Sequence, residues 1–200
     1  VTSTAKLLAD LWLLADADRH RLVVDSLRAG AVLETLQRYL FSEDVQVAPS
    51  PHAVLGVLGP GAAAPDDAPP LPHPFDHAGA AIGPWPVTVI RRGVGAVDGY
   101  ALLVPAEARL AAWQALRAGP PALPPVGWDA LNILRIEAGI PWFGLDMDES
   151  TLLPETGLET AAAGDDKGCY VGQEVIARMQ TYGSARRRLL GLRLEGRDAP

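Results

Sequence analysis

The stretch Lys167-Gly168-Cys169-Tyr170-Val171-Gly172-Gln173-Glu174 is the part of this 200-residue chain that best indicates its fold and chemistry. Two glycines flank the chain's one cysteine, and the residues that follow predict a helix from Gly172 to Gln180. Glycine allows positive φ angles and a close approach of backbone to a ligand. A helix N-terminus and the neighbouring Lys167 would both favour the thiolate of Cys169. From spacing alone, a buried cysteine at a loop–helix junction is slightly favoured over a reactive thiol.

Composition limits the classes of function that the chain can have. Hydrophobic residues make up 48% of it, which is enough for a substantial core. The net charge of −7 argues against direct nucleic-acid binding, because phosphate contacts need clustered Lys and Arg. The apolar run from Leu11 to Ala15 is too short to span a bilayer and follows no basic region, so we expect neither a membrane span nor a signal peptide. A single cysteine excludes an internal disulfide, which fits a cytoplasmic protein, and cannot by itself hold an iron–sulfur cluster.

Apolar runs and chain breakers predict a mixture of strands and helices. Six prolines between Gly59 and Pro74 predict a loop there, since proline cannot donate to a strand ladder. The order lacks a regular βαβ rhythm, so the predicted class is α+β. The expected elements are a hairpin from residues 7–14 and 21–25, helices over 31–41, 105–119 and 128–138, an irregular segment over 151–166, and strands at 45–48, 53–58, 85–91, 100–104 and from 189 onward.

The octapeptide at 167–174 resembles the K-G-C-Y-x-G-Q-E signature of the YgfZ-type folate-binding family, a relative of the glycine-cleavage T-protein. The segment Arg135-Ile136-Glu137-Ala138-Gly139-Ile140-Pro141 is similar to the family's R-I-E-A-G-I-P block, and Leu153-Pro154-Glu155 resembles the piece between them. The R-I-E-A-G block is shared with the T-protein, so it marks only the wider superfamily. The resemblance covers nearly all of the chain. It implies a T-protein-like fold of mixed sheets and helices that binds tetrahydrofolate.

Glu137 is the candidate pterin-binding residue. It lies in the last turn of an expected helix, where the dipole makes a carboxylate unfavourable by about 0.3–1 kcal/mol. Arg135 does not relieve it, because residues i and i+2 do not face each other on a helix. The resemblance gives Glu137 a functional use: one carboxylate can accept two adjacent N–H groups of a pterin ring. The alternative is a surface glutamate at a helix end.

Further folate contacts are implied by the resemblance. Trp128 is a candidate, although its spacing from Glu137 departs from the family and core packing is favoured. Tyr170 of the signature is assigned to the same site. One arginine of residues 186–188, with Arg187 as the choice, would meet the glutamate tail of folate through its guanidinium fork.

Histidine spacing argues against a metal site. His73 and His77 flank Asp76, but Pro72 and Pro74 oppose the helix that an i, i+4 metal-binding pair needs. We therefore expect no bound metal.

The chain departs from the T-protein at two positions. The T-protein's catalytic aspartate belongs to an Asp-Asp pair, for which this chain has Ala9-Asp10. A G-Y-T-G-E-x-G-like segment is replaced here by residues 92–100, without that Thr or Glu. Both departures argue against aminomethyl transfer and agree with the Cys169 signature.

The resemblance also implies a chain truncated at both ends. Residues 1–182 would form the folate-binding domain without its first strands, and residues 183–200 would begin a C-terminal β-barrel. Such a domain would bury less core and could self-associate, which light scattering would test.

Three functions remain open at this point. The leading hypothesis is a tetrahydrofolate-binding accessory protein for iron–sulfur proteins or their assembly factors, and indirectly for tRNA modification, with Cys169 and Lys167 at the reactive or partner-facing site. The second is a folate-dependent aminomethyl or one-carbon transferase with Asp10 as its acid/base group. The third is an interaction module that has lost folate.

Overall fold

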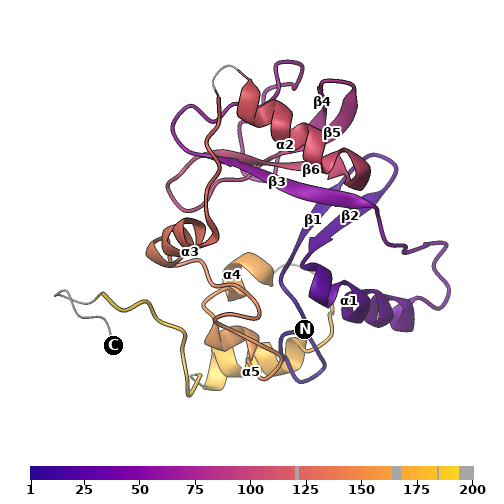
Figure 1. Ribbon diagram of the computed structural model, residues 1–200. Coiled ribbons are helices and arrows are strands. Elements are labelled where there is room, and N and C mark those ends of the chain that lie inside the picture. The colour runs from indigo at the N-terminus through magenta and orange to yellow at the C-terminus, as the bar shows by residue number, and fades with distance from the viewer. Residues whose placement is uncertain (120–121, 164–167, 184, 194–200) are drawn as a thin grey trace. The chain divides into compact units, whose positions relative to one another are not determined.

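The computed structural model describes residues 1–119, 122–163, 168–183 and 185–193 (Figure 1). The chain divides into two compact units, one formed by Val1–Ala48 with Pro141–Pro200 and the other by Pro49–Ile140. Both units mix strands and helices, which confirms the α+β prediction. Each unit has its own core, so the two are taken one at a time. Within the described residues, no helix combines the length and apolar character needed to cross a bilayer.

The second unit is built on a four-stranded antiparallel sheet. Its strands are β3 (His52–Leu58), β4 (His77–Ile82), β5 (Trp85–Arg91) and β6 (Gly99–Pro105), in the order β3-β6-β5-β4. The central strands β5 and β6 are almost continuously buried, as their apolar sequences require. Alternating side chains form a core with Ala112 of α2 (Arg109–Ala118), including Val89, Leu102 and Val104.

Two further helices complete this unit. A short 3-10 helix, η1 (Ala106–Ala108), follows Pro105 and leads into α2, and Gly119 caps the C-terminus of α2. The prediction of a helix between Pro105 and Gly119 is therefore confirmed. The helix α3 (Trp128–Glu137) ends at Ala138, and Gly139 takes a left-handed φ of 67°. This C-terminal glycine is the expected helix stop.

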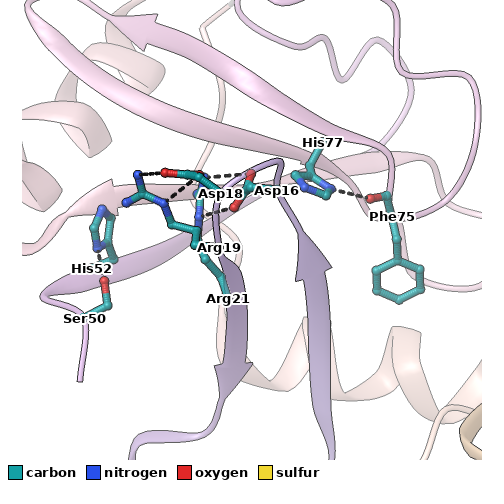
Figure 2. A network of polar contacts seen from close by, with 8 residues as sticks. All are labelled: Asp16, Asp18, Arg19, Arg21, Ser50, His52, Phe75 and His77. Atoms are coloured by element: carbon teal, nitrogen blue, oxygen red, sulfur yellow. Dashed lines mark hydrogen bonds and ion pairs between the residues drawn. The ribbon is translucent and has the colours of Figure 1, made fainter. Parts of the chain in front are cut away.

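The first unit begins with a hairpin of β1 (Leu11–Ala15) and β2 (His20–Val24). Its turn is closed by an Arg21–Asp16 ion pair at 2.9 Å and an Arg19–Asp18 pair at 2.7 Å (Figure 2). The hairpin leads into α1 (Ser26–Tyr39), whose N-cap Asp25 accepts a hydrogen bond from the Leu27 N–H at 2.8 Å. This cap explains why the helix begins five residues before the predicted start at Ala31.

The later part of the first unit is helical. It contains the 3-10 helix η2 (Leu153–Glu155), the short helix α4 (Glu159–Ala162) and α5 (Gln173–Tyr182). The predicted helix after Gly172 is confirmed. The second core gathers around the N-terminus and α5, and consists of Ala5, Leu7, Met147, Leu153, Ala163 and Ile176.

Three predictions about strands are wrong or incomplete. Residues 45–48 form no strand, and neither do the described residues 189–193. The strand β4, with its Ala and Gly residues, was not expected, because it has few of the β-branched residues that mark strands. It forms through pairing with β5 along its whole length.

Gly172 of the octapeptide has a structural role. Its φ is 84°, and a Cβ at this position would lie 2.5 Å from the carbonyl oxygen of Thr2 and 3.2 Å from the amide nitrogen of Ala5. Ala5 is fully buried and itself has a positive φ of 61°. The N-terminal turn therefore packs directly against the start of α5, at a place where only glycine fits.

We expect Gly172→Ala to lower the free energy of unfolding by at least about 2 kcal/mol, because backbone strain and overpacking each cost about 1–3 kcal/mol. Urea unfolding measures this change. Gly168→Ala is the matched control, since a Cβ at Gly168 would meet nothing within 4 Å. Equal stabilities of the two variants would contradict the packing role of Gly172.

Candidate functional site

Asp10 lies immediately before β1 and has an altered protonation equilibrium. Although the residue keeps access to solvent, desolvation of its carboxyl group raises its pKa above the ordinary value of 3.8, and the negative charge of Asp25 raises the pKa further. Hydrogen bonds from the backbone N–H groups of Asp10 and Phe143 partly offset these effects. A carboxyl group with a raised pKa keeps its proton to a higher pH than an ordinary aspartate does.

Cys169 is exposed, so the slightly favoured interpretation of a buried cysteine is wrong. It lies three residues before Gly172, the N-cap of α5, and is therefore outside the first helical turn. Its neighbour Tyr170 is half-buried and packs against the core of the first unit. Lys167 lies outside the described residues. The signature thus combines an exposed thiol, a packing tyrosine and a glycine required by close contact.

Arg187 contacts a carboxylate that the sequence did not single out. Its Nε lies 3.3 Å from Oε1 of Glu155, a residue that is 7% exposed. The other oxygen of Glu155 accepts the Leu152 N–H at 2.9 Å. The buried charge of Glu155 is thus hydrogen-bonded at both oxygens, as a buried carboxylate requires. The one available signal was the Leu153-Pro154-Glu155 segment.

A polar pocket of about 310 Å³ lies beside this pair. Asp148 in its wall accepts hydrogen bonds from the Ser150 hydroxyl at 2.6 Å and the Ser150 N–H at 2.8 Å, and the Ser150 bonds hold the pKa of Asp148 below its usual value. The lining of the pocket therefore combines the carboxylate of Asp148 with the guanidinium of Arg187. It is lined by Gly144, Leu145, Asp146, Met147, Asp148, Ser150, Thr151, Glu155, Arg187, Arg188 and Leu189.

Glu137 and Trp128 occupy the two ends of α3 in the second unit. Glu137 is exposed, whereas Arg135 is buried and donates to Asn132 at 2.8 Å and to the Ile140 carbonyl at 3.2 Å. Trp128 is 60% exposed, so the favoured expectation of core packing is wrong. Glu137 lies nine positions after Trp128 on this helix, a rise of about 14 Å, and the two side chains therefore point to opposite faces. A ring held at Glu137 therefore does not reach Trp128 along this helix.

The histidines have local partners. The Nδ1 atom of His77 lies 3.0 Å from the Phe75 carbonyl oxygen, and that of His52 lies 2.8 Å from the Ser50 hydroxyl (Figure 2). Among the described residues there is no group of three or more His, Cys, Asp or Glu side chains that could hold a metal ion.

A match to a family model defines the class of protein to which the chain belongs. The family model described as the GCVT N-terminal domain matches residues 2–166. The chain therefore belongs to this family, which places it in the T-protein superfamily. The two units of the fold both lie largely within the matched range.

The chain is similar in sequence to several aminomethyltransferases. The chain is 31% identical over 193 residues to an aminomethyltransferase of Bordetella parapertussis, covering 90% of this chain and 50% of that protein. It is 33% identical over 124 residues to an aminomethyltransferase of Synechococcus elongatus, covering 62% of this chain and 32% of that protein. The chain thus spans about a third to a half of the length of these relatives.

A solved structure has the same fold. The aminomethyltransferase T of the glycine cleavage system from Bartonella henselae superposes with a TM-score of 0.71 and 21% sequence identity. The superposition covers 92% of this chain and 52% of that one. The expected T-protein-like fold is confirmed.

We expect Asp10→Asn to raise the melting temperature at pH 7. The raised pKa means that the folded state favours protonated over ionised Asp10. The stability that protonated Asp10 contributes is therefore fully present below pH 3.8 and is lost as the pH rises through the folded-state pKa. The variant's advantage should therefore shrink on acidification and vanish below about pH 3.8. Thermal melts between pH 3 and 8 measure it.

Asp18→Asn is the control with the opposite sign. Its hydrogen bond to Arg19 lowers the pKa of Asp18, but the pair is fully exposed, so we expect little change or a slight loss of stability at pH 7. The quantity to compare is the melting temperature of Asp10→Asn minus that of wild type. If this difference is smaller at pH 7 than at pH 3, the desolvation of Asp10 is contradicted.

Proposed function

We propose that the protein binds tetrahydrofolate and transfers a one-carbon unit of the aminomethyl type. The observation that carries this proposal is the 193-residue alignment with an aminomethyltransferase, which spans nearly the whole chain. The match to the GCVT N-terminal domain supports it over residues 2–166. Because the chain spans only part of these relatives, the activity of the whole protein belongs to the proposal.

Glu137 would hold the pterin ring. Its carboxylate is exposed at the last residue of α3, and the left-handed turn at Gly139 ends the helix directly behind it. Two adjacent N–H groups of a pterin can donate to one carboxylate in a bidentate pair, which gives orientation as well as affinity. Arg187 is the candidate for the carboxylates of the folate tail, and its pairing with Glu155 would be in competition with that role.

Asp10 would serve as the acid/base group. Its raised pKa keeps a larger protonated fraction near neutral pH than an ordinary aspartate has. Asp10 directly precedes β1, and the Phe143 N–H acts on its pKa, so the carboxyl group lies between the start of this strand and the loop of Phe143. Ala9-Asp10 keeps one aspartate of the family's pair, which is the one available for proton transfer here.

A second candidate function follows from the exposure of Cys169. In this alternative the protein is a YgfZ-type accessory factor for iron–sulfur proteins or their assembly factors, with indirect effects on tRNA modification. An exposed thiol in the complete K-G-C-Y-x-G-Q-E signature favours it. The missing Thr and Glu near residues 92–100 also favour it over transfer. Cytoplasmic location stays a prediction that depends on the single cysteine.

We expect Glu137→Ala to weaken tetrahydrofolate binding by about 1.5–3 kcal/mol, the range for a hydrogen bond to a charged group. A titration followed by tryptophan fluorescence measures it, because the chain has five tryptophans. Asp129→Ala removes a carboxylate from the opposite end of α3 and should leave the affinity unchanged. Equal affinities of wild type and Glu137→Ala would contradict the binding of the pterin by Glu137.

The two candidate functions make opposite predictions for Asp10 and Cys169. If the protein is a transferase, Asp10→Asn should lower kcat by about 100-fold, the scale of general acid–base catalysis, while Cys169→Ala leaves it unchanged. Aminomethyl transfer to tetrahydrofolate measures this in vitro. If it is an accessory factor, Cys169→Ala should lower iron–sulfur enzyme activities in cells, and Asp10→Asn should not.

A further inference from the structure

We propose that Arg28 is a positioning residue that holds Asp10 in its place by clamping the two backbone segments on either side of it. The proposal rests on the role of Asp10 in the proposed transfer. Arg28 projects from the first turn of α1, and its side chain is 22% exposed.

The first segment that Arg28 holds leads into Asp10. Its Nε and Nη2 atoms both donate to the carbonyl oxygen of Leu8, at 3.0 and 2.9 Å. Leu8 lies two residues before Asp10, and this stretch belongs to no strand or helix. The two hydrogen bonds to this carbonyl oxygen therefore fix a part of the chain that regular secondary structure does not fix.

The second segment that Arg28 contacts is the loop that contains Phe143. The guanidinium of Arg28 lies 4.9 Å from the centre of the Phe143 ring. The backbone N–H of this same Phe143 is one of the groups that lower the pKa of Asp10, so Phe143 lies near the carboxyl group. Arg28 also forms an ion pair with Glu149, farther along the same loop. One side chain thus contacts both the segment that bears Asp10 and the loop that contains Phe143.

Arginine is chemically suited to this position. Its planar guanidinium has five donors in a fixed fork and can stack on a ring while its edges donate hydrogen bonds. Lysine has a single ammonium group, so it can neither donate twice to Leu8 in the fork geometry nor stack on Phe143. Arg28→Lys should therefore keep the charge and lose most of the positioning.

Asp25, the N-cap of α1, is the charged residue that acts on the pKa of Asp10. The charge of Arg28, in the first turn of the same helix, is paired with Glu149 of the loop after Phe143. Without the clamp, we expect the Asp10 carboxyl to gain water and its pKa to fall toward 3.8, since desolvation is the largest cause of the raised value. The effect of Arg28 would then be exerted through Asp10 and not on the substrate.

The test combines Arg28→Ala with Asp10→Asn in aminomethyl transfer by the complete protein. We expect Arg28→Ala alone to lower kcat at least ten-fold with the KM for tetrahydrofolate within three-fold of wild type. Added to Asp10→Asn, it should cost less than two-fold more, because a positioning residue has no effect once its target is gone. A similar loss in both backgrounds would overturn the proposal.

Arg38→Ala is the matched control. Arg38 lies on the same helix and forms an exposed ion pair with Glu34 at 2.9 Å, so its removal changes the charge equally without touching Leu8 or Phe143. We expect it to leave kcat unchanged. Phe143→Leu is a second variant that keeps the backbone N–H but removes the stacking partner, and it should lower kcat in the same direction if Arg28→Ala does not fold.

An NMR titration separates this proposal from the proposed function. The amide signal of Phe143 reports the ionisation of Asp10 without any turnover. In Arg28→Ala, Arg28→Lys and Phe143→Leu the midpoint of this titration should move toward pH 3.8, whereas Arg38→Ala should leave it unmoved. If no variant transfers a one-carbon unit but the midpoint shifts as stated, the proposed transfer fails and the clamp stands. An unmoved midpoint in all folded variants would overturn the clamp.

Discussion

The first unit depends on the contact between the two separate chain segments that form it, Val1–Ala48 and Pro141–Pro200. The Leu7 N–H donates to the Thr151 carbonyl at 2.9 Å, and the Leu153 N–H donates to the Ala5 carbonyl at 3.0 Å. These bonds hold the N-terminal turn against Gly172, where no side chain would fit. The core around Ala5 and Ile176 exists only because both parts of the chain meet here. The hairpin, the Asp10 segment and the octapeptide all take their positions from this junction.

Local signals in the sequence predicted most of the fold. The helices that begin or end at Gly172, Pro105 and Gly139 were found because each has a residue with a fixed conformational preference. The strand β4 was missed because its Ala and Gly residues become a strand only through pairing with β5. The division into two units was not foreseen either, since the hydrogen bonds that join Ala5 to Leu153 leave no local pattern in the sequence.

The candidate site was only partly accessible to sequence reasoning. Glu137 and Asp10 were identified through resemblance. Desolvation and the charge of Asp25 raise the pKa of Asp10, and the Phe143 N–H partly offsets them; no local pattern in the sequence connects these groups to Asp10. Trp128 was expected in the core because large aromatic residues usually pack there, yet the first turn of α3 leaves it exposed. The octapeptide, predicted to be a chemical signature, proved partly structural. Gly172 is required by packing and Tyr170 packs against the core, whereas the thiol of Cys169 is exposed.

The interruption of the first unit by the second has a consequence for the order of folding. Residues of the second unit are contiguous, so its sheet can form as soon as that stretch leaves the ribosome. The first unit must wait until the segment after Pro141 is made, because its core needs Leu153 and Ile176. Once the second unit has folded, its residues no longer belong to the flexible loop between Ala5 and Leu153, so less entropy is lost on closing that loop. The order of synthesis thus favours folding of the second unit before the first.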